Sequence, residues 1–405
     1  MAMPDQNTGP SFRLSWLIYD TRYRSMTIQI LVLFGFMTGA VWLVNNMLDN
    51  LALLGKDLSF GFLAAEAGFE IEPQLVEYSS QSSNFMAAVV GVLNTLMVAV
   101  VGCFIATILG VAIGVARLSP NLLLSRFTEA YVEIFRNVPI LLWILFGIAI
   151  MSEIFPQPRD FRGVDATASM MFGETVAITN RGFYIPAPVF ESGSAIVVMT
   201  FLLSLVGIWL FGKWSLKQQE MTGHIRSTFW IKIGILIVPV VLVYLIMGRP
   251  IALNYPELKG FNFRGGLHLR APFIALTLAL ALYTSAFIAE AVRAGIQAID
   301  KGQTEAASAL GLRPKRTLRL VILPQALRVI IPPLISQYLN LTKNSSLALA
   351  VGYIDVTGTL GGTILNQTGR EMECILLLMA VYLTISLAIS TAMNIYNNSI
   401  KLKER

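Results

Sequence analysis

Eight long apolar runs constrain this 405-residue chain more than any other feature of its sequence. A helix needs about 20 apolar residues to cross a bilayer, because each residue adds about 1.5 Å. Hydrophobic residues make up 55% of the chain and charged residues 13%, which is far too apolar for a soluble surface. We therefore predict an all-α, polytopic membrane protein with spans at about 27–46, 86–116, 127–151, 195–212, 229–247, 272–297, 326–352 and 374–396.

The basic residues gather beside alternate ends of these runs. Arg117, Lys213 and Arg313 each follow an even-numbered run, whereas the segments 47–85 and 152–194 are acidic or mixed in charge. Cytoplasmic loops carry an excess of lysine and arginine, so an even number of spans with both termini in the cytoplasm is predicted. The net charge of +6 then reflects topology, and no nucleic-acid partner is expected. The first run has no small-residue cleavage pattern behind it, which predicts a retained anchor.

One charged loop, at 300–325, interrupts the apolar pattern between the sixth and seventh runs. It predicts a turn at Lys301-Gly302, a short helix from Thr304 to Leu310 and a left-handed stop at Gly311. The residues at fixed offsets within it are Glu305, Ala306, Ala307, Gly311, Val321, Leu323 and Pro324. An alanine-rich helix at the membrane surface is the plain interpretation, but five residue types at fixed spacing favour a docking surface.

This spacing resembles the loop by which the membrane subunits of bacterial ABC importers hold their ATPase, with Val321 in place of the commoner isoleucine. Four other segments resemble polar amino-acid permeases: GVLNTL at 91–96, YVEIFRNVP at 131–139, AFIAEAVR at 286–293 and LTKNSSL at 341–347. The resemblance implies the five-helix core of a type I importer. The chain length and the added segments are most similar to the first permease subunit of general L-amino-acid or glutamate/glutamine/aspartate/asparagine transporters.

The resemblance also implies an organisation and a set of partners. The expected parts are a cytoplasmic tail (1–26), a first helix with a periplasmic segment (27–84), two core parts (85–151 and 271–400), an insertion with two helices (152–270) and a second tail (401–405). The implied partners are a second permease, so that a heterodimer is expected, two ATPase copies, a periplasmic amino-acid-binding protein and the bilayer of the bacterial inner membrane. The chain has no G-x-x-x-x-G-K-[ST] phosphate loop, so it is not expected to be an enzyme. We expect no cofactor in this chain, with ATP and Mg²⁺ bound by the ATPase.

Polar residues inside the spans are the candidates for a transport pathway, because such groups are costly in hydrocarbon. Tyr283, Thr284 and Ser285 lie near the middle of their span, whereas Glu290 lies near its inner end, three residues from Arg293. The alternative for Glu290 is a structural ion pair with Arg293. A further pair, Asn94 and Thr95, either lines the same cavity or bonds another helix.

The seventh run is the most polar one. It carries Asn340, Lys343, Asn344 and Ser345 after Pro332-Pro333, so we expect a kinked, buried helix. The resemblance places the gate here. Lys343 either receives the carboxylate of an amino acid or extends to the outer headgroups, and both remain open.

The remaining features predict little chemistry. His224 and His268 lie on opposite sides of the predicted membrane without neighbouring ligands, so no metal site is expected. Cys103 and Cys374 fall within apolar runs, where packing is their default role. The long insertion predicts either an outer cap that meets the binding protein or a structural collar. An ion-coupled secondary carrier is the alternative function, but it requires paired broken helices and only one is predicted; a membrane enzyme is more remote still.

Overall fold

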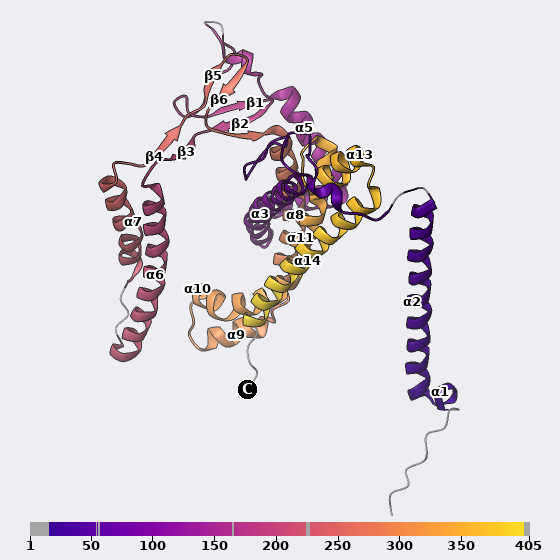
Figure 1. The fold of residues 1–405 in the computed structure, drawn as a ribbon. Helices are drawn as coiled ribbons and strands as arrows, with labels where there is room; N and C mark the ends of the chain where they lie inside the picture. Colours follow the sequence, from indigo (N-terminus) through magenta and orange to yellow (C-terminus); the bar gives the residue numbers. More distant parts are fainter. Residues whose placement is uncertain (1–15, 54, 56, 164–165, 224–226, 401–405) are drawn as a thin grey trace, which may run out of the picture.

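The computed structural model describes residues 16–53, 55, 57–163, 166–223 and 227–400. Within these ranges the chain is a helical membrane protein with a small cap of strands (Figure 1). The long helices are α2 (Thr21–Leu53), α3 (Asn84–Ala116), α6 (Ser194–Thr222), α7 (Phe229–Ile246), α8 (Ala271–Gln297), α11 (Leu323–Asn344) and α14 (Glu371–Ile400). The short ones are α1 (Trp16–Tyr19), α4 (Leu122–Asn137), α5 (Ile140–Ile154), α9 (Lys301–Ala309), α10 (Pro314–Thr317), α12 (Val356–Gly358) and α13 (Leu365–Thr368). Tighter or wider turns form η1 (Gly61–Ala64), η2 (Pro158–Phe161), η3 (Leu318–Ile322), η4 (Ser345–Val351) and η5 (Thr359–Ile364).

Helix α8 is the centre of the core. In the most apolar stretch of α8, 72% of the residues are buried inside the chain. The corresponding share is 28% for α3 and zero for α2 and α7. Helices α3, α5 and α11 pack around it. Gly110 and Gly114 of α3 permit this approach, because a Cβ atom at either position would lie less than 3.0 Å from Ile288 or Val292 of α8. Small residues bring membrane helices together in this way.

The predicted spans are present as helices, with one correction. Seven stretches of the described ranges are long and apolar enough to cross a membrane, or eight if the bent pair α4–α5 is one span. The span predicted over 127–151 is formed by two helices instead of one, because α4 and α5 meet at 105°. Pro139 explains the break: it has no N–H to donate and it disfavours helical backbone at Val138, which is extended at φ −99°.

The seventh span departs from α geometry at places other than the expected one. Helix α11 continues through Pro332 and Pro333. The irregular turns lie instead at its two ends, where the π-type turn η3 precedes it and the tighter turn η4 follows it from Ser345.

The insertion forms a cap of short strands that the sequence did not predict. Its strands are β1 (Ala177–Thr179), β2 (Gly182–Ile185), β3 (Ala187–Phe190), β4 (Ile251–Asn254), β5 (Glu257–Lys259), β6 (Asn262–Arg264) and β7 (Leu267–Arg270). They pair antiparallel as β1–β2–β7, β3–β4 and β5–β6. Tyr184 and Phe263 fill the interior of the cap together with Ala177. Strand β7 runs directly into α8, which fixes the cap over one end of the core.

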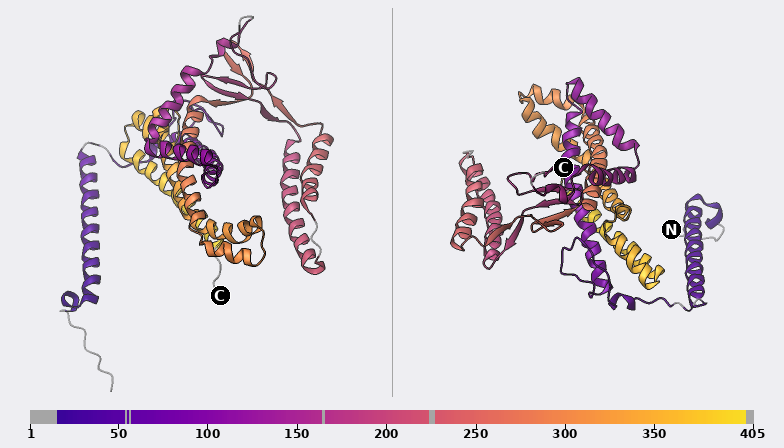
Figure 2. Two further views of the ribbon diagram at one scale, coloured as in Figure 1. Left: turned by 180° about the vertical axis from the view of Figure 1, so that it is seen from behind. Right: turned by 90° about the horizontal axis from the view of Figure 1, so that it is seen from above.

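Three helices stand away from the core (Figures 1 and 2). Helix α2 lies on one side, and the α6–α7 hairpin lies on the opposite side beneath the cap. The apolar side chains of these helices are largely exposed, as expected of surfaces that face lipid or another subunit.

Candidate functional site

The loop between α8 and α11 is a compact helical unit. Asp300 caps α9, since its Oδ1 accepts the Gly302 N–H at 2.7 Å. Lys301 and Gly302 therefore begin the helix, and the prediction of a turn there was wrong. Gly311 ends helix α9 as predicted. Its φ is +74°, and a Cβ atom added there would have no neighbour within 4 Å. The Leu312 N–H returns to the carbonyl of Ala307 at 3.1 Å, which closes the last turn.

The outer surface of this loop combines apolar and basic side chains. Glu305 and Ala306 are exposed, whereas Ala307 is buried. Leu310 is 81% exposed and Leu320 62%, with arginines and lysines between them. Leu323 and Pro324 are also exposed, at the start of α11. Exposed leucines rimmed by charged residues are typical of a protein-binding surface.

The loop is attached to both neighbouring helices. Gly295 near the end of α8 lies against Ile330 of α11. The Gln325 side chain of α11 donates to Gln303 Oε1 of α9 at 3.2 Å. Helix α9 is thus bonded to α11, which packs against α8.

Glu290 belongs to a cluster of charges at the end of α8 nearest this loop. Its carboxylate pairs with Arg293 of the same helix and with Arg117 at the end of α3. Glu129 of α4 lies 3.8 Å from Arg117. The expected pair with Arg293 is present, and Arg117 is a partner that sequence spacing cannot show. The cluster fastens three helices near the loop.

Asn94 and Thr95 are wholly buried where the chain after η4 folds back onto α3. Asn94 Nδ2 donates to the carbonyl oxygens of Pro73 at 3.1 Å and Ile354 at 2.9 Å. Thr95 Oγ1 accepts the Val356 N–H at 3.1 Å. Both side chains thus join segments of the chain, and the Asn94 oxygen has no donor among the described residues.

The three mid-span residues of α8, Tyr283, Thr284 and Ser285, differ in how far they are buried. Ser285 is buried, and its hydroxyl lies 2.8 Å from that of Tyr131 on α4. Thr284 is also buried, whereas Tyr283 is partly exposed and contacts Phe287 at 5.0 Å between ring centroids. Within this chain only Tyr283 of the three reaches the surface of the described structure.

The polar residues at the end of α11 also differ in how far they are buried. Ser345 is buried and donates to the Thr342 carbonyl at 2.7 Å. Asn340 and Lys343 are exposed, and Asn344 is half-buried. Asn340 and Lys343 thus lie on a surface that the described chain does not cover.

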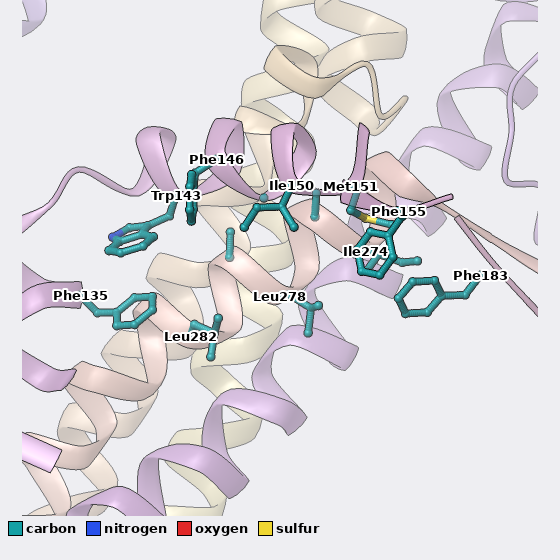
Figure 3. Close-up of a pocket in the computed structure, with 13 residues that line it drawn as sticks. Phe135, Trp143, Phe146, Ile150, Met151, Phe155, Phe183, Ile274, Leu278 and Leu282 are labelled. Carbon is teal, nitrogen blue, oxygen red and sulfur yellow. The ribbon is translucent and has the colours of Figure 1, made fainter. Parts of the chain in front are cut away.

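An apolar cavity of about 320 Å³ lies between α5 and α8 (Figure 3). Phe135, Trp143 and Phe155 line it with Ile274 and Leu278. Its walls offer almost no hydrogen-bonding groups, so it suits a hydrocarbon group and not a zwitterion.

No cluster of three or more potential metal ligands occurs in the part of the chain that the structure describes. His224 lies outside the described residues. His268 stacks on Tyr184 in the cap, at 4.1 Å between ring centroids. Burial is the main cause that lowers the pKa of His268 below its ordinary value.

Comparison with known proteins identifies relatives that cover most or all of this chain. A model of the family "binding-protein-dependent transport system inner membrane component" matches residues 106–401. The chain is 52% identical to the glutamate/glutamine/aspartate/asparagine transport system permease protein of Rhodobacter capsulatus, over all of both chains. It is 43% identical to the general L-amino acid transport system permease protein of Rhizobium johnstonii, over 99% of this chain and 98% of the relative.

Proposed function

This chain belongs to the family of binding-protein-dependent transport system inner membrane components, and we propose that it is the permease subunit of an ABC importer for L-amino acids. The names of its two relatives support acidic amino acids and their amides as substrates, within a broad range. The proposed direction is from the periplasm to the cytoplasm across the bacterial inner membrane, with both termini in the cytoplasm.

The capped helix α9 and its connection to α8 and α11 carry this proposal. A partner ATPase, which would bind ATP and Mg²⁺, contacts the surface around Glu305, Ala306 and Leu310. When two ATPase copies close, α9 moves as a rigid lever and takes the inner ends of α8 and α11 with it. The cavity between this permease and a second one of similar fold then turns from the cytoplasm to the periplasm.

The second permease completes the pathway in this proposal. Lys343 and Asn340 lie on the uncovered surface of α11, where they meet either the partner or the substrate. A lysine ammonium there would bind the carboxylate of an amino acid. The buried Thr284, Ser285, Asn94 and Thr95 then support the pathway by holding helices in place, and Tyr283 borders it.

The cap is proposed to meet the periplasmic binding protein. It lies at the end of α8 opposite the coupling loop, and it offers exposed aromatic side chains such as Phe261. A structural collar is the alternative role. Binding of the amino-acid-loaded binding protein to complexes with and without the cap residues 157–190 and 251–268 separates the two.

Reconstituted transport tests the function as a whole. The chain, a second permease, the ATPase and the binding protein are placed in proteoliposomes, and L-glutamate uptake is measured. We expect uptake that requires ATP and the binding protein and that stops when the lysine of the ATPase phosphate loop is replaced. Uptake by this chain alone, driven by a sodium or proton gradient, would instead establish the secondary carrier.

A further inference from the structure

A polar pocket of about 440 Å³ lies between the cap and the outer end of α8. This volume falls within the range of about 300–1,000 Å³ that is usual for small-molecule sites. The residues that line it come from the cap, α5, the start of α8 and the turn after η4: Ile148, Asn180, Arg181, Asn262, His268, Arg270, Ala271, Pro272 and Gly352. None of the residues that the sequence predicted for the pathway is among them.

The charge of this pocket is positive. Arg181 and Arg270 border it, and no acidic residue does. Glu72 pairs with Arg270 at 3.1 Å, with both side chains substantially exposed, so part of one charge is offset. Arg181 is exposed and has no ion-pair partner within the described ranges, so its N–H donors are available to a ligand.

The start of α8 adds to the positive field. This helix of 27 residues begins at Ala271, and its N-cap Arg270 makes no capping bond with its side chain. The N-terminus of a helix carries partial positive charge, which favours anions. Here the helix dipole alone contributes, because the Ala271 N–H is bonded to the Arg181 carbonyl and Pro272 has no N–H. The helix end and the two arginines therefore act on the same space.

The residues around the pocket are held firmly. The Ala271 N–H and His268 Nε2 both contact the carbonyl oxygen of Arg181, at 3.0 and 3.2 Å. Tyr184 stacks on His268 and donates its hydroxyl to Asn262 at 2.9 Å. The Arg181 carbonyl is thus held to the start of α8 and to the cap, while the side chains of Arg181 and Arg270 remain exposed.

Asn180 supplies an acceptor beside the two arginines. Its side-chain oxygen is enclosed and has no donor among the described residues. The pocket therefore offers cationic donors for a carboxylate, and its lining includes Asn180, whose amide oxygen accepts no hydrogen bond from the described residues.

We propose that this pocket is an entry site for an acidic L-amino acid, at which Arg181 and Arg270 hold its carboxylates before it reaches the cavity within the membrane. The inference rests on the proposed import function and adds to it a second, external binding site. Two arginines favour a substrate with two carboxylates over its amide, because an amide group forms weaker hydrogen bonds with guanidinium.

The test uses the complex of the two permeases and the ATPase in nanodiscs, without the binding protein. Binding of L-glutamate is measured by calorimetry for the wild type, Arg181→Gln and Arg264→Gln. Arg264 is the matched control, because it is an exposed arginine on β6 that does not line the pocket. We expect Arg181→Gln to raise the Kd about tenfold and Arg264→Gln to leave it unchanged.

Unchanged L-glutamate binding in both Arg181→Gln and Asn180→Ala would overturn the entry site. Uptake by the wild-type complex in the same preparation would show that the proposed import function still holds. If Arg181→Gln weakened instead the affinity for the loaded binding protein, with free L-glutamate unaffected, the pocket would be a docking site for an acidic side chain. A wild-type complex that transports no amino acid would refute the proposed function itself, and the entry site with it.

Discussion

Arg117 and Glu290 form an ion pair between the inner ends of α3 and α8, although 173 positions separate them in the sequence. Arg293 binds the same carboxylate from one turn further along α8. The pair lies next to the segment that leads into the loop between α8 and α11, and it ties this end of α8 to α3.

Replacing Arg117 by methionine should lower the free energy of unfolding by about 1–2 kcal/mol, because the side chain is only 12% exposed and leaves a charged partner behind. Reversible unfolding in detergent measures the change. Arg126→Met is the control, since Arg126 is 73% exposed and its one ion-pair partner among the described residues is Glu129. Equal losses of unfolding free energy in the two variants would show that the Arg117–Glu290 pair stabilises the fold no more than an exposed ion pair does.

Replacing Gly311 by valine should weaken the ATPase contact. The φ of +74° strains a β-branched residue by about 1–3 kcal/mol, although nothing stands near the added side chain. Asparagine tolerates this backbone, so Gly311→Asn serves as the control. Co-purification of the ATPase with the permease is the measurement. Full ATPase content in Gly311→Val would contradict docking at this loop.

The cap should loosen in acid. The pKa of His268 is lowered in the folded state, so the stability due to its neutral form is present above its unfolded pKa of about 6.5 and lost as the pH falls through the folded value. Hydrogen exchange of β2 and β7, corrected for intrinsic rates, should rise between pH 7.5 and 5.5. His268→Phe keeps the ring stack and should remove this dependence; a variant that responds like the wild type would exclude His268 as the cause.

Replacing Lys343 by methionine should reduce uptake while leaving assembly and resting ATPase activity intact, because Lys343 is exposed. A direct bond to a carboxylate is worth about 1–3 kcal/mol, or roughly a tenfold to hundredfold rise in the KM for uptake. Ser285→Val should instead reduce stability, since it removes the contact with Tyr131. Normal uptake in Lys343→Met would place the substrate site on the partner permease.

The orientation of α6 and α7 should follow the positive-inside pattern. Cysteines at Ser169 in the cap segment and at Ser227 beyond the other end of α6 are both exposed. In spheroplasts an impermeant thiol reagent should label the first and not the second. Labelling of Ser227→Cys alone would reverse the hairpin and remove the cap from the periplasm.

The long helices and the end of α9 at Gly311 could be predicted from the sequence because their signals are local. Apolar length defines α3 and α8, and the left-handed Gly311 follows from its place after a helix. The contacts of Ser285 and Asn94 could not be predicted, since their partners Tyr131 and Ile354 lie far away in the chain.

The strands of the cap could not be predicted because their local signals are weak. Each has only three or four residues, which is too short for an alternating pattern to stand out from a loop. Glycines at positive φ are the local turn signals: Gly182, at φ +131°, lies where β1 meets β2, and Gly260, at φ +65°, lies in the turn between β5 and β6. The pocket beside this turn forms only when β7 pairs with β2 across the inserted helices.

The ladder between β3 and β4 has a consequence for how this chain differs from shorter permeases. It pairs Phe190 with Ile251, so the chain leaves for α6 and returns from α7 at adjacent points. The two helices are therefore a side branch on a two-stranded stalk, and the path from α5 to α8 does not depend on them. The pairing of β2 with β7 and the start of α8 therefore lie outside this branch.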